Sequence, residues 1–272
     1  MPRVAAIDCG TNSIRLLVAE LTPRHDGTVD LRDLHREMRI VRLGQGVDAT
    51  GELAPEALER TRAALADYTI AARRKGAEKV RMVATSATRD AKNRDEFFRM
   101  TRETLGVEAE VISGDEEARL SFTGAVGEQD PDDGPFVVVD VGGGSTELVL
   151  GTWDGRRAEV LAAKSVDIGC VRITERALKS DPPTASEIAT ARDLAGKVLT
   201  DAFDVVDVAR ARTWMGVAGT VTTLSAIALG LPEYDSDRVH LSTLTSADID
   251  RLATELVVSE HDILDGIALS LA

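Results

Sequence analysis

Residues 136–150 read Phe-Val-Val-Val-Asp-Val-Gly-Gly-Gly-Ser-Thr-Glu-Leu-Val-Leu, which predicts a strand, a tight polar turn and a second strand. The β-branched run from Phe136 to Val139 is typical of a buried strand. The three glycines lack a Cβ, so backbone N–H groups there can approach a phosphate closely. Asp140 and Glu147 flank the turn and supply the oxygen ligands that Mg²⁺ prefers. Taken alone, the stretch also fits an ordinary glycine-rich hairpin.

The chain opens with a second copy of this pattern. Residues 3–20 run from an apolar strand through a polar glycine turn into another strand, and the turn region contains Asp8, Asn12 and Ser13. The pair indicates a duplicated unit, because two unrelated hairpins would rarely share this order of residues. Each turn would cradle a phosphate, and two such turns facing one another would form a cleft.

Two further stretches place charged residues directly after a predicted strand. Residues 85–93 are rich in small and hydroxylated side chains and contain Arg89, whose planar head is suited to phosphate. A helix cap with a solvated arginine fits this stretch equally well. Glu116 and Glu117 either favour a helix start through the helix dipole, or one of them faces the cleft and activates water.

A third glycine-hydroxyl turn contains Gly219 and Thr220, after a strand predicted over 212–217. It enters a helix, and a helix N-terminus presents free N–H groups to an anion. Without the other two turns, a plain capping turn would be the simpler interpretation.

The alternation of strands and helices predicts the α/β fold class. Apolar side chains at helical spacing predict long helices, and the end of the chain predicts one more strand and helix. The expected helices span 55–75, 94–106, 185–208 and 246–257, the last strand 257–259 and the last helix 262–271.

The composition limits the classes of function. Of 272 residues, 43% are hydrophobic but only 3% aromatic, so we expect a core of aliphatic side chains. The net charge of −14 argues against a generic nucleic-acid binder, although local arginines and a metal could still hold a polyanion. Cys9 and Cys170 lie in apolar segments, which favours a reduced, cytoplasmic protein. We expect neither a signal peptide nor a membrane-spanning segment.

Five motifs together resemble the exopolyphosphatase / guanosine pentaphosphate phosphohydrolase family, a branch of the actin, sugar-kinase and Hsp70 superfamily. The resemblance covers nearly the whole chain and implies two ribonuclease-H-like (actin-like ATPase) domains, 1–124 and 125–272, that flank an interdomain cleft. It looks like the short, two-domain form of the family, with a homodimer as a candidate assembly. The motifs are Ala-Ile-Asp-Cys-Gly-Thr-Asn-Ser, Ala-Thr-Ser-Ala-Thr-Arg-Asp-Ala-Lys-Asn, Ile-Ser-Gly-Asp-Glu-Glu-Ala-Arg-Leu, Asp-Val-Gly-Gly-Gly-Ser-Thr-Glu and Ala-Gly-Thr-Val-Thr-Thr-Leu.

The resemblance also implies roles for individual residues. Glu117 would be the general base, and Asp140 and Glu147 the other catalytic carboxylates. These two would handle Mg²⁺, or Mn²⁺ as an alternative, with Asp8 facing them from the other domain. Arg89 would bind the polyphosphate chain. The remaining phosphate-binding residues would be Asn12, Ser13, Gly143, Gly144, Ser145, Gly219 and Thr220.

One departure from the family pattern lies near residues 254–257. Family members carry a Pro-Gly-Arg-Ala-Asp-type motif with its own helix before the final segment, and this chain runs straight through. Either the given sequence omits a disordered region or the chain is shortened. A shortened chain would affect the expected pairing of the last strand, and with it the expectation of activity.

The family likeness predicts an Mg²⁺-dependent exopolyphosphatase that releases terminal orthophosphate from inorganic polyphosphate. The first alternative substrate is the 5′-phosphate of the alarmone pppGpp. A sugar-kinase-like or actin-like ATPase is less favoured, because the acids at 116–117 and Arg89 suit a phosphatase. A non-catalytic sensor that binds polyphosphate or an alarmone is the alternative from another class. No nucleic acid and no membrane is expected as a partner.

Overall fold

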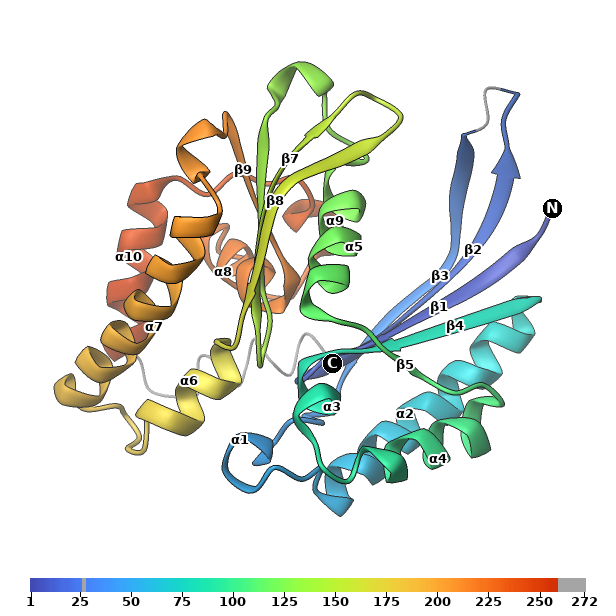
Figure 1. Ribbon diagram of the computed structural model, residues 1–272, viewed down its shortest axis with the longest axis horizontal. Helices are drawn as coiled ribbons and strands as arrows, with labels where there is room; N and C mark the ends of the chain where they lie inside the picture. Colours follow the sequence, from blue (N-terminus) through green and yellow to red (C-terminus); the bar gives the residue numbers. More distant parts are fainter. Residues whose placement is uncertain (26–27, 259–272) are drawn as a thin grey trace. The chain divides into compact units, whose positions relative to one another are not determined.

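The computed structural model describes residues 1–25 and 28–258 (Figure 1). The chain divides into two compact units, Met1–Glu117 (unit 1) and Ala118–Ala272 (unit 2). The boundary falls inside helix α5 (Gly114–Val126), which therefore contributes to both units.

Unit 1 is built on a mixed sheet with the strand order β3-β2-β1-β4-β5. The first three strands are antiparallel neighbours, whereas β4 runs parallel to β1, and β5 parallel to β4. Because parallel strands end at one edge, the segments that follow β1, β4 and β5 all begin at the same edge of the sheet. The strands are β1 (Arg3–Cys9), β2 (Ser13–Pro23), β3 (Val29–Ile40), β4 (Lys79–Ala84) and β5 (Glu110–Val111).

The helices of unit 1 bury an aliphatic core against this sheet. Helix α2 carries seven buried residues, among them Leu65 and Tyr68. The Tyr68 hydroxyl donates to the carbonyl of Ile14 at 3.0 Å, so the phenol is satisfied inside the core. The helices are α1 (Val47–Thr50), α2 (Pro55–Arg74), α3 (Ser86–Asp90) and α4 (Arg94–Leu105).

Unit 2 repeats the arrangement of unit 1. Its sheet has the order β8-β7-β6-β9, in which β6, β7 and β8 are antiparallel neighbours and β9 is parallel to β6. The duplication inferred from the two glycine turns is therefore present in the topology. The elements are β6 (Phe136–Val141), β7 (Thr146–Trp153), β8 (Ala158–Val166), β9 (Thr213–Val217), α6 (Cys170–Ala177), α7 (Ala185–Val205), α8 (Ala218–Ala228), α9 (Ser236–Val239), α10 (Ser246–Val258) and short 3₁₀ turns at Pro131–Asp133 and Val208–Arg210.

The two faces of the unit 2 sheet pack against different helices. Phe136 and Val138 join Phe122 of α5 in one cluster, whereas Val137 and Ala202 of α7 belong to the other. Alternate residues of β6 thus serve opposite layers, as the period of a strand requires. Helix α5 is fixed on the first face by its buried apolar side chains.

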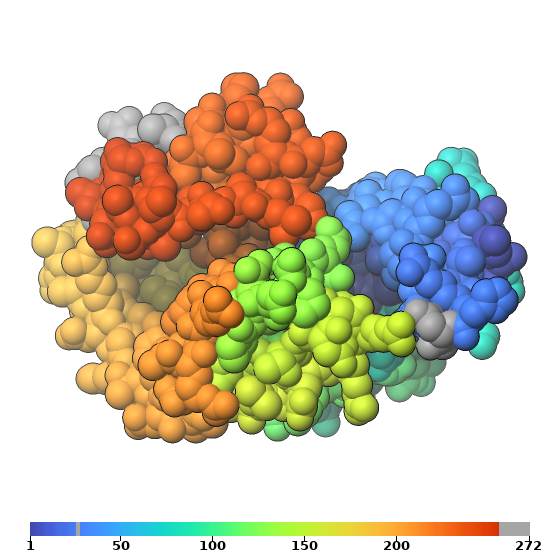
Figure 2. All heavy atoms as spheres, turned by 90° about the horizontal axis from the view of Figure 1, so that it is seen from above, coloured from blue at the N-terminus to red at the C-terminus, as the bar shows by residue number. Residues whose placement is uncertain are grey.

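Unit 2 is packed less completely than unit 1 around β9. Among the described residues no strand lies beyond β9, whereas β5 lies beside β4 in unit 1. Trp214 of β9 is 54% exposed, and of residues 185–205 only Ala202 is buried. In the space-filling view, a recess separates α7 (gold) from α10 (red) (Figure 2). Within the described residues, the outer side of β9 therefore exposes apolar surface at Trp214.

The predicted fold class, α/β with two ribonuclease-H-like units, is confirmed. The domain boundary at 124/125 and the cleft stay predictions. The strand expected at 257–259 is wrong for Val257 and Val258, which end helix α10, because a short β-branched run is too weak to end a helix that precedes it. Residue 259 and the helix expected at 262–271 lie outside the described residues.

Every described helix is too short or too polar to cross a bilayer.

Glu187 ties the start of α7 to the segment that precedes it. Its carboxylate accepts hydrogen bonds from the backbone N–H groups of Lys179, Ser180 and Thr184, at 2.9, 3.0 and 2.7 Å. The Thr184 hydroxyl in turn accepts from the Glu187 N–H, which completes a capping box. The hydrogen bond from the Thr184 N–H, followed by the others, lowers the pKa of Glu187 to about 2.

We expect Glu187→Gln to remove a pH-dependent part of the stability. The folded-state pKa lies below the unfolded value, so the contribution is full above about pH 5 and is lost as the pH falls towards 2. The thermal midpoint of the variant should therefore lie below that of the wild type at neutral pH, and the gap should narrow on acidification. Thermal scans of both proteins at several pH values test this. A gap that is constant with pH would contradict it, and Glu103→Gln on the exposed side of α4 is the matched control.

Candidate functional site

The two glycine turns close with the same hydrogen bond. In unit 1 the N–H of Gly10 donates to the carbonyl of Ser13 at 2.9 Å, and in unit 2 the N–H of Gly142 donates to the carbonyl of Ser145 at 3.0 Å. Each turn joins the first two strands of its sheet, so Ser13 and Ser145 occupy equivalent positions. The sequence similarity of the two hairpins thus reflects one backbone geometry.

In unit 2, the residues that begin α6 hold the carbonyl groups of the turn. The N–H groups of Cys170 and Val171 donate to the carbonyls of Gly142 and Gly143, both at 3.0 Å. Arg172 Nε donates to the carbonyl of Gly144 at 2.8 Å. In a planar trans peptide, the C=O and the following N–H point in opposite directions. The N–H groups of Gly143, Gly144 and Ser145 therefore point away from α6, and none of them has an acceptor among the described residues. Three consecutive free amides of this kind can bind an anion.

The turn of unit 1 is held in the same way by the segment after β3. The N–H groups of Val41 and Arg42 donate to the carbonyl of Asn12 at 2.9 and 2.8 Å, and that of Gly44 donates to Thr11 at 2.8 Å. The N–H groups of Asn12 and the residue after it are thereby directed away from this segment. Both turns owe their orientation to the chain that follows the third strand of each sheet.

Two glycines outside the turns allow this close approach. A Cβ at Gly169 would lie 2.5 Å from the carbonyl carbon and oxygen of Gly143, and a Cβ at Gly44 would lie 2.3 Å from Thr11 Cγ2. Both distances are far below a normal carbon contact, so any larger residue would move the turn. Neither glycine was among the predicted site residues.

Asp140 and Glu147 lie side by side on one face of the unit 2 sheet. They are direct cross-strand partners on β6 and β7, and Ser165 on β8 is the partner of Glu147. Such partners have Cβ atoms about 4.5–5.5 Å apart. Ser165 Oγ donates to Glu147 Oε1 at 2.8 Å, and Ser121 Oγ of α5 donates to Asp140 Oδ2 at 2.6 Å. Glu147 is 1% exposed, so its carboxylate is held almost out of water.

This pair of carboxylates fits a magnesium ion. Mg²⁺ is commonly held by one or two protein carboxylates, the remaining ligands being waters and substrate phosphates. Among the described residues, no three His, Cys, Asp or Glu side chains gather as an all-protein metal cage would require. Asp140 and Glu147 would leave the other positions around such an ion to waters and phosphate oxygens.

Asp8 has a different neighbour from Asp140. Its cross-strand partner is Arg15, whose Nη1 lies 3.5 Å from Asp8 Oδ2, and both side chains are 43% exposed. An arginine thus stands where unit 2 has Glu147. The positive charge opposes a cation at Asp8 alone, and the predicted role of Asp8 as a metal ligand stays a prediction.

Arg89 and Glu117 contact each other directly in unit 1. Arg89 Nη1 donates to Glu117 Oε2 at 2.9 Å and to the carbonyl of Ile112 at 3.0 Å. The parallel pairing of β4 with β5 brings α3 and the start of α5 to the same edge of the sheet. The side chains are 21% and 18% exposed, so this ion pair is partly shielded from solvent. The predicted base and the predicted phosphate-binding arginine are therefore neighbours.

Gly219 and Thr220 begin helix α8 at the edge that also carries Asp140. The residue before the helix, Val217, is the parallel partner of Asp140. Ala218 has φ 69°, a left-handed conformation that is strained for a residue with a Cβ. Such strain is concentrated at functional sites, which is consistent with the predicted role of this corner.

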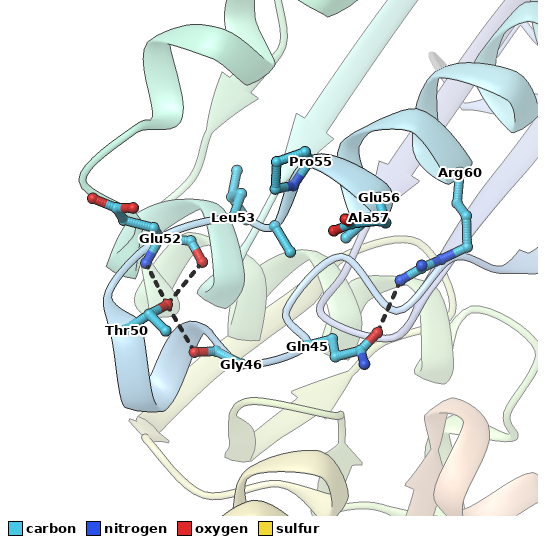
Figure 3. A pocket seen from close by; sticks show the side chains of 10 residues that line it. Gln45, Gly46, Thr50, Glu52, Leu53, Pro55, Glu56, Ala57 and Arg60 are labelled. Carbon is cyan, nitrogen blue, oxygen red and sulfur yellow. Dashed lines mark hydrogen bonds between the residues drawn. The ribbon is translucent and has the colours of Figure 1, made fainter.

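A pocket elsewhere in unit 1 contains none of these residues. It has a volume of about 560 Å³ and is lined by residues 45–46, 50 and 52–57 together with Arg60, which donates to Gln45 Oε1 at 3.1 Å (Figure 3). Glu52 and Glu56 lie in its lining. Together with Arg60 the lining carries two acids and one base, so it offers no excess of positive charge for a polyanion.

A family model described as the Ppx/GppA phosphatase family matches residues 17–265. The chain belongs to this family. It is 51% identical over 322 aligned positions to a protein named exopolyphosphatase 2 from Mycobacterium tuberculosis, covering 100% of this chain and 99% of the relative. It is 33% identical over 261 positions to a guanosine-5′-triphosphate,3′-diphosphate pyrophosphatase from Vibrio atlanticus, covering 96% of this chain and 49% of that protein.

The solved structures agree with this assignment. A crystal structure of an exopolyphosphatase-like protein superimposes with a TM-score of 0.89 at 43% identity, covering 98% of this chain and 81% of that one. The predicted family is thus confirmed. Since 322 aligned positions exceed the 272 residues here, at least 50 positions of that alignment carry no residue of this chain. The location of the missing family segment near 254–257 stays a prediction.

We expect Gly169→Ala to weaken anion binding by the unit 2 turn. The added Cβ would displace Gly143 and rotate the amides that follow. Loss of one hydrogen bond to a charged ligand corresponds to about tenfold or more in affinity. The measurement is an orthophosphate titration followed through the NMR shifts of the Gly143, Gly144 and Ser145 amides.

The matched control is Gly196→Ala on exposed α7, where a Cβ meets nothing within 4 Å. It should leave orthophosphate binding unchanged. A Gly169→Ala variant that binds orthophosphate as the wild type does would show that the turn is not held through this contact.

Proposed function

We propose that this protein is an exopolyphosphatase, which hydrolyses the terminal phosphoanhydride bond of inorganic polyphosphate and releases orthophosphate. The observation that carries the proposal is the row of three outward amides, at Gly143, Gly144 and Ser145, beside the carboxylates of Asp140 and Glu147. The name of the relative that is 51% identical supports the same substrate.

Phosphate groups would bind at the strand ends of both units. The amides of the unit 2 turn and of the first turn of α8, at Gly219 and Thr220, would hold non-bridging oxygens. Asn12 and Ser13 would do the same in unit 1. For this, the two edges must flank one substrate, which is the cleft that the sequence predicts.

Asp140 and Glu147 would hold Mg²⁺, or Mn²⁺ in its place, with Asp8 as a further acid from unit 1. When bound, the ion supplies positive charge that offsets the negative charge of the terminal phosphate. The cross-strand pairing of the two carboxylates supports this assignment.

Glu117 would orient and deprotonate the attacking water. Arg89 Nη1 donates to its carboxylate at 2.9 Å and would also attract the polyphosphate chain. A positioned general base contributes about 10²–10⁴-fold to the rate. The acidic protein and its polyanionic substrate repel one another, so metal and local arginines are needed for binding.

A second candidate substrate is pppGpp, which also ends in a phosphoanhydride. The relative from Vibrio atlanticus, named as a pyrophosphatase of that compound, is the observation that favours it. Initial rates with long polyphosphate, short polyphosphate and pppGpp separate the two. A higher kcat/KM for pppGpp would replace the first proposal by the second.

We further propose a cytoplasmic location, because Cys9 and Cys170 are both free thiols. Nucleic acid is not proposed as a partner, on the ground of the net charge of −14, and neither is a membrane. The homodimer suggested by the family resemblance stays a prediction.

We expect Glu117→Gln to lose about 10²–10⁴-fold in kcat, because it keeps the shape of the side chain but cannot accept a proton. Phosphate release from polyphosphate is measured with and without Mg²⁺, for wild type and variant, and polyphosphate binding is measured separately. The wild type should require Mg²⁺, and the variant should still bind polyphosphate.

Glu116→Gln is the matched control, since the Glu116 carboxylate faces Arg81 at 3.2 Å and is exposed. It should keep nearly full activity. Wild-type turnover in Glu117→Gln would remove Glu117 from the mechanism. Tight binding by the wild type without any release of phosphate would instead support a non-catalytic sensor.

A further inference from the structure

Each of the two proposed metal ligands accepts a hydrogen bond from a serine hydroxyl. Ser121 donates to Asp140 Oδ2 at 2.6 Å, and Ser165 donates to Glu147 Oε1 at 2.8 Å. We propose that Ser121 and Ser165 are positioning residues that hold these carboxylates in the orientation that binds the divalent cation. The inference rests on the proposed function, since it concerns the same site.

Ser121 is presented by a rigid part of helix α5. Ala118 and Phe122, on either side of it in the sequence, are fully buried in the core of unit 2. The helix cannot turn without exposing these side chains, so the hydroxyl has a fixed position relative to β6. The 2.6 Å distance is typical of an O–H donor to an ionised carboxylate.

Ser165 is fixed by the register of the sheet. It is the direct cross-strand partner of Glu147, so both side chains stand on the same face of neighbouring strands. Glu147 is 1% exposed, and a buried carboxylate is stable only with donors around it. The hydroxyl replaces part of the lost hydration and restricts rotation of the carboxylate.

The equivalent row in unit 1 lacks this arrangement. Asp8 is followed across the strands by Arg15 and Met38, where unit 2 has Glu147 and Ser165 after Asp140. The Ser165 hydroxyl therefore occurs in the unit that has a carboxylate on its second strand. The fold that the two units share does not require it. This contrast favours a role in the metal site over a role in folding the sheet.

Hydrogen-bond partners of metal ligands usually contribute 10–100-fold to metal affinity or activity. An ionised carboxylate only accepts hydrogen bonds, so a hydroxyl that binds one oxygen sets the plane of the group for its other interactions. Two hydroxyls from different elements, α5 and β8, would fix the two ligands independently. Their effects should therefore combine in a double variant.

The experiment uses the full chain with Ser121→Ala, Ser165→Ala and the double variant, and Ser121→Thr and Ser165→Thr as variants that keep the hydroxyl. Binding of Mn²⁺ in the presence of orthophosphate is measured by electron paramagnetic resonance. The Mg²⁺ concentration for half-maximal phosphate release is measured in parallel. Each alanine variant should weaken Mn²⁺ binding and raise the Mg²⁺ requirement about 10–100-fold, and each threonine variant should recover most of the loss.

Thr123→Ala is the matched control, because the Thr123 hydroxyl donates to the carbonyl of Arg119 on the same helix. It should bind Mn²⁺ as the wild type does. Thermal midpoints show which variants are folded. If an alanine variant does not fold, the test of the inference rests on the threonine variant at that position and on the variants of the other serine.

Wild-type Mn²⁺ binding in both alanine variants, or no recovery with threonine, would overturn the inference. The proposed function fails separately, if the wild type binds Mn²⁺ but releases no phosphate from polyphosphate. In that case a loss of Mn²⁺ binding in the serine variants would still support their positioning role. A wild type that binds no Mn²⁺ would overturn the positioning role even if phosphate is released.

Discussion

The candidate site depends on how the carbonyl groups of two glycine turns are held. A peptide unit is planar, so fixing a carbonyl fixes the direction of the next N–H. In unit 2 the start of α6 and Arg172 fix three consecutive carbonyls, and in unit 1 the segment 41–44 fixes two. The direction of these N–H groups in each turn is therefore determined by residues that follow the third strand of the sheet. Gly44 and Gly169 lie against these turns, where the Cβ of any other residue would clash with them.

The two units share a fold but differ in the side chains that they place beside their glycine turns. The turn has the same closing hydrogen bond in both units, but the cross-strand row of side chains next to it differs. Asp8 faces an arginine, whereas Asp140 faces a second carboxylate. Unit 1 instead pairs Arg89 with Glu117. The paired carboxylates thus lie in unit 2 and the acid–arginine pair in unit 1, so the proposed cation site and the proposed general base come from different units.

Local motifs were predictable from the sequence, and contacts across strands were not. The turns at Gly10 and Gly142 are contiguous segments with strong conformational preferences, so their positions and strands follow from the residue pattern. Ser165 meets Glu147 only through the register of β7 with β8, which contains an irregularity at Leu150/Gly151. Ser121 depends on which face of α5 packs on the sheet. The strand expected at Val257 and Val258 failed for a different reason, because a short β-branched run is too weak to end the helix that precedes it.

The incomplete packing of unit 2 affects the three turns unequally. The turn at 142–145 and its carboxylates are held by β7, β8, α5 and α6, and the apolar clusters on both sheet faces lie beneath them. Gly219 and Thr220 follow β9, whose outer edge has no described neighbour and whose Trp214 is exposed. A strand with one free edge constrains its ends less than a central strand does. Asp140 and Glu147, the proposed metal ligands, are therefore supported from more sides than Gly219 and Thr220. The proposed phosphate contacts at α8 are the part of the candidate site that depends most on the packing of β9.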